Sequence, residues 1–102
     1  MKIVEYIRKN WEEIYSQSHG QPVTRNGYVL SGERWTDECI YDYLKKTHPK
    51  EVAKIPTSQY EDYLSEAIDS VIASEGWEGY VHIEPSIAKE QMGITVFYRR
   101  IQ

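Results

Sequence analysis

The sequence is poor in cysteine and in long apolar runs. Its 102 residues include one cysteine, Cys39, which excludes a disulfide within the chain. Small secreted domains usually carry several disulfides. No apolar run approaches the roughly 20 residues that cross a bilayer, and residues 1–5 do not lead into a signal-peptide segment. These absences predict a cytoplasmic protein.

Positive charge is missing from a long stretch of the chain. Residues 55–88 contain no lysine or arginine, whereas the remainder contains all 12 basic residues and is mildly positive. One element is therefore expected to carry a net negative charge, whereas the rest of the chain carries a small net positive charge. The stretch carries seven acidic residues: Glu61, Asp62, Glu66, Asp69, Glu75, Glu78 and Glu84.

Motifs for catalysis or for cofactor binding are also missing. The six glycines are scattered and form no phosphate-binding loop. His82 and Glu84 would share one face of a strand, but a zinc or iron site needs three or four ligands, and no histidine or cysteine pair has the usual close spacing. We therefore expect no cofactor and no metal site. A small enzyme built on His82, Glu84 and the acids of the 58–75 segment is the third alternative for function.

Cys39 lies near the start of a predicted helix, where the helix dipole lowers the pKa of a thiol. Its neighbours Ile40 and Tyr43 belong to the apolar stripe of that helix, and Cys39 borders the stripe. We therefore expect a buried structural thiol and no catalytic nucleophile.

Apolar spacing predicts three helices. Residues 2–17 repeat apolar side chains every three or four positions, which places them on one stripe. A second helix is expected to begin at Thr36, whose hydroxyl can cap the first free N–H groups. The third spans 58–75, with a capping box of Ser58 and Glu61 at its start.

The end of the third helix is marked by Gly76 and Trp77. Glycine fits the left-handed position that follows a helix, and the next apolar residue commonly packs back on the last turn. Trp77 is therefore expected to contact Ile72. The wide apolar face of this helix consists of Tyr60, Tyr63, Leu64, Ala67, Ile68, Val71 and Ile72.

Alternating residues predict a C-terminal hairpin. Segments 80–84 and 94–101 alternate apolar and polar residues, and their connection is too short for a crossover, so they should pair antiparallel. Residues 18–26 read as a loop that ends at the turn signal Asn26–Gly27. Residues 28–30 are expected to form a short strand.

The predicted fold is a single α+β domain, residues 1–102, with three helices packed on a small antiparallel sheet. The order of the elements is that of the winged-helix DNA-binding fold, which it resembles in order alone, because no fingerprint residues accompany it. The apolar faces are expected to meet in one core that contains Trp11, Ile14, Leu64, Ile68, Val71, Val96 and Tyr98.

Nucleic-acid recognition is disfavoured by the third helix. A helix that enters the major groove must present basic or amide side chains to bases and phosphates. This helix instead presents Asp62, Glu66 and Asp69 opposite its apolar stripe, and DNA would repel them. We expect no sequence-specific binding to duplex DNA. A winged-helix-like regulator that contacts DNA or assembles through its helices is the alternative.

The function favoured by these residues is that of a small, acidic, non-enzymatic protein that docks on a basic surface of a macromolecular partner. One version is an inhibitor that imitates nucleic acid, as small phage or mobile-element proteins often do. Tyr41 lies on the predicted second helix away from its apolar stripe, and the 85–93 loop carries two apolar residues. The predicted partner-binding residues are Asp62, Glu66, Asp69, Tyr41, Ile87 and Met92.

Overall fold

The fold is described from a computed structural model, which covers residues 2–54 and 60–101 and, for residues 60–62, the backbone alone. Within that part of the chain, no helix is both long and apolar enough to cross a bilayer. The elements are α1 (Lys2–Lys9), α2 (Trp11–Ser18), β1 (Val23–Arg25), β2 (Tyr28–Leu30), β3 (Trp35–Thr36), α3 (Asp37–Thr47), α4 (Pro49–Ala53), α5 (Tyr60–Glu75), β4 (Gly79–Ile83), α6 (Pro85–Ala88) and β5 (Ile94–Arg100).

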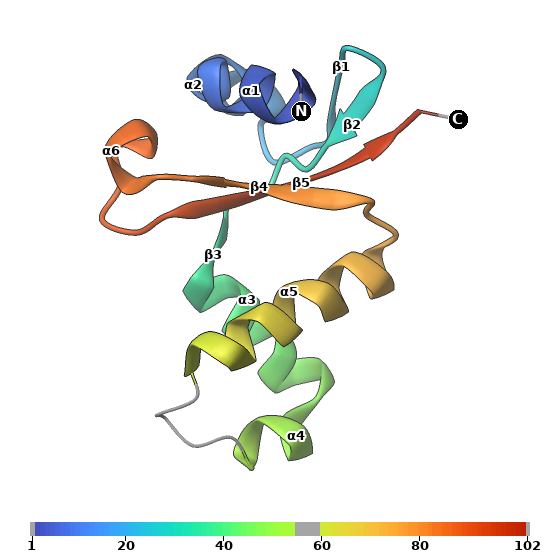
Figure 1. Ribbon diagram of the computed structural model, residues 1–102, viewed down its shortest axis with the longest axis vertical. Helices are drawn as coiled ribbons and strands as arrows, with labels where there is room; N and C mark the ends of the chain where they lie inside the picture. The colour runs from blue at the N-terminus through green and yellow to red at the C-terminus, as the bar shows by residue number, and fades with distance from the viewer. Residues whose placement is uncertain (1, 55–59, 102) are drawn as a thin grey trace.

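Strand β5 is the centre of one five-stranded sheet (Figure 1). Strand β4 pairs along one of its edges, from Gly79 opposite Tyr98 to Ile83 opposite Ile94. Strands β2 and β3 follow one another along the other edge, and β1 pairs with β2. Every one of these pairings is antiparallel, which confirms the predicted C-terminal hairpin and the α+β class.

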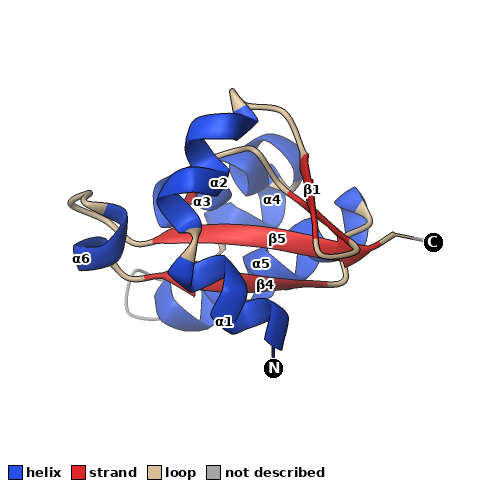
Figure 2. Cartoon of the chain, turned by 90° about the horizontal axis from the view of Figure 1, so that it is seen from above, coloured by secondary structure: helices blue, strands red, loops and turns tan. Residues whose placement is uncertain are grey.

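Helices cover both faces of the sheet, as Figures 1 and 2 show. Helices α1, α2 and α6 lie on one side, and α3, α4 and α5 lie on the other. The prediction of three helices on one small sheet was therefore too simple: four helices have eight residues or more, and two layers of helices enclose the sheet. A winged-helix arrangement is not shown by the described residues.

The core is divided in two by the sheet. Because side chains alternate along a strand, Ile94, Val96 and Tyr98 of β5 face α1 and α2, whereas Phe97 faces α3 and α5. The predicted single core was wrong for this reason. Its members Trp11, Ile14, Val96 and Tyr98 lie in the first cluster, Val71 lies in the second with Ile68 at its margin, and Leu64 belongs to neither.

The predicted helix over residues 2–17 is interrupted at Asn10, which has φ −112° and ψ 19°. The amide nitrogen Nδ2 of Asn10 donates a hydrogen bond to the carbonyl of Tyr6, at 3.0 Å. The backbone N–H of Asn10 donates to the same carbonyl at 3.0 Å, so the regular helical bond is kept at this junction. The segment forms two helices, α1 and α2, and both contribute buried residues to the first core.

The hairpin of β1 and β2 turns at the predicted signal. Asn26 and Gly27 both have positive φ, at 51° and 80°, as a two-residue hairpin turn of type I′ requires. The predicted strand over residues 28–30 is confirmed. The predicted loop over residues 18–26 was wrong for Val23–Arg25, because three residues are too few to show an alternating pattern before their partner strand is known.

Both predicted helix ends that the structure describes are confirmed. The hydroxyl of Thr36 accepts a hydrogen bond from the N–H of Cys39 and caps α3. At the end of α5, Gly76 has φ 77°, and the N–H of Trp77 donates to the carbonyl of Ile72 at 3.0 Å. Trp77 and Ile72 both pack against the second core. The predicted capping box of Ser58 and Glu61 lies outside the described residues.

Ser31 lies in the connection between β2 and β3 and forms two hydrogen bonds with Phe97 of β5. Its N–H donates to the carbonyl of Phe97 at 2.8 Å, and its hydroxyl accepts from the N–H of Phe97 at 3.0 Å. Ser31→Ala removes the hydroxyl and leaves that buried N–H without its partner. We expect the free energy of unfolding to fall by about 1–3 kcal/mol. Urea denaturation followed by circular dichroism measures the loss, and Ser65→Ala on the exposed side of α5 is the control.

Candidate functional site

Helix α5 is anchored to the second core and presents carboxylates on its outer side. Tyr63, Ala67 and Val71 are buried against α3 and the sheet. Glu66 and Asp69 are exposed, as the helical spacing predicted. The backbone places Asp62 one turn before Glu66, but the side chain of Asp62 lies outside the described residues.

Glu66, Asp69 and Glu75, the acids of α5 whose side chains are described, have no ion-pair partner in the described part of the chain. The sequence of α5 contains no basic residue. The ion pairs found lie elsewhere, and they use the acids of α2 and of the two connections before and after β4. They are Arg25–Glu13 at 3.5 Å, Lys89–Glu12 at 3.0 Å, Arg100–Glu78 at 3.6 Å, and Arg34–Glu90. Glu66 and Asp69 therefore keep their charge open to solvent.

A groove between α3, α4 and α5 lies next to these carboxylates, with a cavity volume of about 170 Å³. We call it the helical groove. Its floor is apolar and consists of Leu44, Val52, Tyr63 and Ala67, and its rim consists of His48, Glu51, Glu66 and Ser70. The groove was not predicted from the sequence, because its residues come from three helices. The spacing of residues within each helix does not show how the three helices pack together.

Tyr41 is half-buried, and the prediction that it faces away from the core was wrong. Its ring meets the ring of Tyr63 edge to face, with centroids 5.5 Å apart, and the ammonium of Lys45 lies 5.2 Å from its centroid. The spacing within α3 identified the side that Ile40 and Leu44 bury. It did not show that α5 covers a second side of the same helix.

Ile87 and Met92 are not beside the acidic residues of α5. They lie in the connection between β4 and β5, where they are 42% and 40% exposed. This connection was predicted as a loop but contains helix α6, whose Ala88 is buried in the first core. Helix α6 is on the side of the sheet opposite α5 (Figure 1). The structure thus brings Tyr41 against Tyr63 of α5 and keeps Ile87 on the other side of the sheet.

Cys39 is exposed, and the prediction of a buried thiol was wrong. Helix α3 buries Ile40 and Leu44, while Cys39 lines a separate shallow hollow on the exposed part of the helix. The ring of His82 lies against Gly93 at the edge of the sheet. Among the described residues, no group of three histidine, cysteine, aspartate or glutamate side chains is placed to hold a metal ion.

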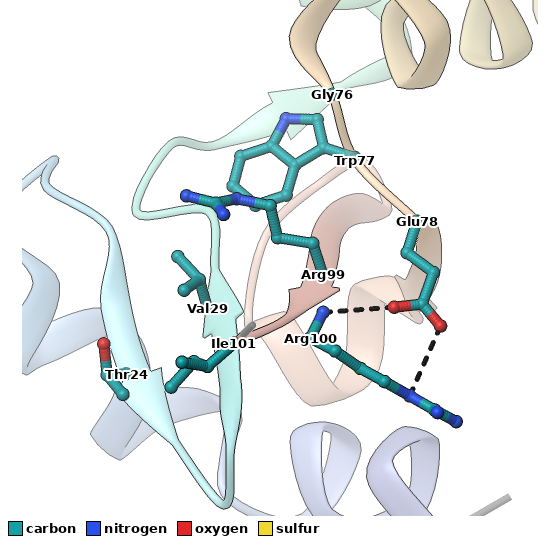
Figure 3. A pocket seen from close by; sticks show the side chains of 8 residues that line it. All are labelled: Thr24, Val29, Gly76, Trp77, Glu78, Arg99, Arg100 and Ile101. Carbon is teal, nitrogen blue, oxygen red and sulfur yellow. Dashed lines mark hydrogen bonds and ion pairs between the residues drawn. The ribbon is translucent and has the colours of Figure 1, made fainter.

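A larger and more open hollow lies at the other end of α5, with a volume of about 910 Å³ (Figure 3). The guanidinium of Arg99 is 5.9 Å from the ring centroid of Trp77, and that ring stacks on buried Phe97 at 6.3 Å. Arg100 is paired with Glu78, so Arg99 supplies the surplus positive charge. The adjacent pair Arg99–Arg100 at the end of a strand was the available sequence signal for this hollow.

Two groups at or beside this hollow, Tyr98 and Arg100, have raised pKa values. Burial, helped by the charges of Glu78 and Tyr28, raises the pKa of Tyr98 above its usual value. The hydrogen bond with Tyr28 raises the pKa of Arg100. Tyr98 therefore remains neutral and Arg100 remains a cation over the physiological range. The hollow is basic, whereas the helical groove has an acidic rim.

Comparison of the chain with protein-family models, with curated proteins and with solved structures gives no significant match.

Proposed function

We propose that the chain is a small, non-enzymatic, cytoplasmic binding protein that docks on a basic surface of a macromolecular partner through α5. The observation that carries this proposal is the pair Glu66 and Asp69, which are exposed on α5 with no ion-pair partner among the described residues. Complementary charge of this kind accelerates association and selects the partner.

The rigidity of α5 supports the proposal. The helix has 16 residues, and Ala67 and Val71 on its inner side are fully buried. The backbone positions of Glu66 and Asp69 on such a helix are fixed before binding, so little backbone freedom is lost when their carboxylates meet a partner. In one version of the proposal, the partner is a nucleic-acid-binding protein, and the carboxylates occupy the positions of phosphates in its groove.

A winged-helix-like DNA-binding regulator is the second candidate. The observation in its favour is the surplus charge of Arg99 in β5 of the hairpin, because phosphate contacts need unpaired cations. Against it, α5 would carry Glu66 and Asp69 toward the phosphates. Fluorescence anisotropy of a labelled duplex at low salt separates the two candidates. Binding of the duplex by the unaltered protein that is lost in Arg99→Glu would favour the regulator over the docking protein.

The docking proposal is tested by reversing charge on α5. Hexalysine serves as a defined basic probe, and its affinity is measured by isothermal titration calorimetry at several salt concentrations. For Glu66→Lys with Asp69→Lys we expect a loss of about tenfold or more and a weaker dependence on salt.

The matched control reverses two exposed acids elsewhere, Glu5→Lys with Glu33→Lys, and so changes the net charge by the same amount. It should leave most of the affinity in place. An equal loss in both double variants would show that hexalysine responds to net charge alone, and the proposal would then be wrong. Circular dichroism confirms that both variants remain folded.

A further inference from the structure

We infer that the helical groove receives the side chain of one lysine or arginine of the partner, an inference that rests on the proposed function. The groove lies between α3, α4 and α5, and Glu66 belongs both to its rim and to the exposed carboxylates of α5. A cation drawn to α5 therefore arrives at the mouth of an apolar pocket.

The floor of the groove suits the aliphatic part of such a side chain. Leu44, Tyr63 and Ala67 are buried, and Val52 is half-buried. Lysine and arginine commonly lay their methylene groups on an apolar surface while the charged end stays in contact with water or with an acid. A small inorganic cation would gain nothing from this floor.

The rim of the groove suits the charged end. Glu51 comes from α4 and Glu66 from α5, both are exposed, and neither has an ion-pair partner in the described part of the chain. No lysine or arginine is among the described residues that line the groove. The nearby Lys45 and Lys46 line a different hollow with Cys39. The lining is therefore complementary to a cation.

The size of the groove selects a single side chain over a cofactor. Its volume of about 170 Å³ is well below the roughly 300–1,000 Å³ of sites that enclose small organic ligands. A flexible aliphatic stem that ends in one charge fits both the volume and the division between apolar floor and acidic rim.

The length of the stem provides the first test. Hexapeptides of lysine, ornithine and diaminobutyrate carry the same number of amines on stems of decreasing length. If the groove receives the stem, affinity should fall roughly fourfold for each methylene group removed, which is the factor expected from burial of one methylene. Calorimetry at one ionic strength measures the series.

The outcomes separate the inference from the proposed function. Equal binding of the three peptides, with the salt dependence intact, would overturn the inference and leave docking through α5 in place. Absence of binding by all three would overturn the docking proposal itself.

A filled groove provides the second test. Ser70 lines the groove on α5, whereas Ala73 is exposed on the same helix outside the lining. In Ser70→Phe, the three peptides should bind with nearly equal affinity because their stems no longer enter. Ala73→Phe adds a ring to the same helix and should preserve the dependence on stem length. A preserved dependence in folded Ser70→Phe would contradict the inference. Should that variant not fold, the peptide series with the unaltered protein decides.

Discussion

Replacement of Phe97 with alanine is expected to lower the free energy of unfolding by about 3–5 kcal/mol. Phe97 is the one phenylalanine of the chain and is fully buried at the centre of the second core. Its ring meets Trp35 at 5.3 Å, Trp77 at 6.3 Å and Tyr80 at 6.4 Å between centroids. Three aromatic rings around one position cannot close the space that the substitution leaves.

A loss of this size is large against the roughly 5–15 kcal/mol that stabilises most domains. Phe97→Ala should therefore be only marginally folded near 37 °C. Urea denaturation with circular dichroism measures the effect. Ile101→Ala is the control, since Ile101 is 49% exposed just after the same strand and should change stability by no more than about 0.5 kcal/mol. A loss for Phe97→Ala that does not exceed the control would mean that the second core is wrongly placed.

Gly32→Ala is expected to cost about 3 kcal/mol, the upper end of the usual cost of overpacking. A Cβ at Gly32 would lie 1.9 Å from the carbonyl oxygen of Gln21 and 2.4 Å from its carbonyl carbon. Both contacts are with main-chain atoms, so the segment before β1 must move as a whole. The next residue back, Ser31, holds β5 by two hydrogen bonds and limits any shift of Gly32 itself.

The matched control is Gly93→Ala. A Cβ at Gly93 would also be too close to its neighbour, at 2.3 Å from Cε1 of His82, but that neighbour is the end of a side chain. His82 can rotate, so we expect a smaller loss for Gly93→Ala, and His82→Ala should relieve it further. Thermal unfolding of the variants compares the two positions. If Gly32→Ala melts at the temperature of the unaltered protein, Gln21 does not approach Gly32 as described.

The sequence by itself determined the features that depend on neighbouring residues. The cap at Thr36, the turn at Asn26–Gly27 and the end of α5 at Gly76 were all predictable, because each is fixed by a hydrogen bond or a backbone angle within a few positions. The C-terminal hairpin followed from alternation over two segments. The exposure of Glu66 and Asp69 followed from helical spacing alone.

Only the tertiary structure decided which surfaces those elements cover. The apolar residues of β5 point to both faces of the sheet, and spacing cannot show that helices cover each face, so one predicted core became two. For the same reason Tyr41 was covered by α5 while Cys39 was left exposed. The helical groove exists because residues of α3, α4 and α5 come together, and contacts between residues far apart in the sequence decide how these helices pack. Local sequence fixes what each element presents, and the packing of distant elements fixes what remains open to a partner.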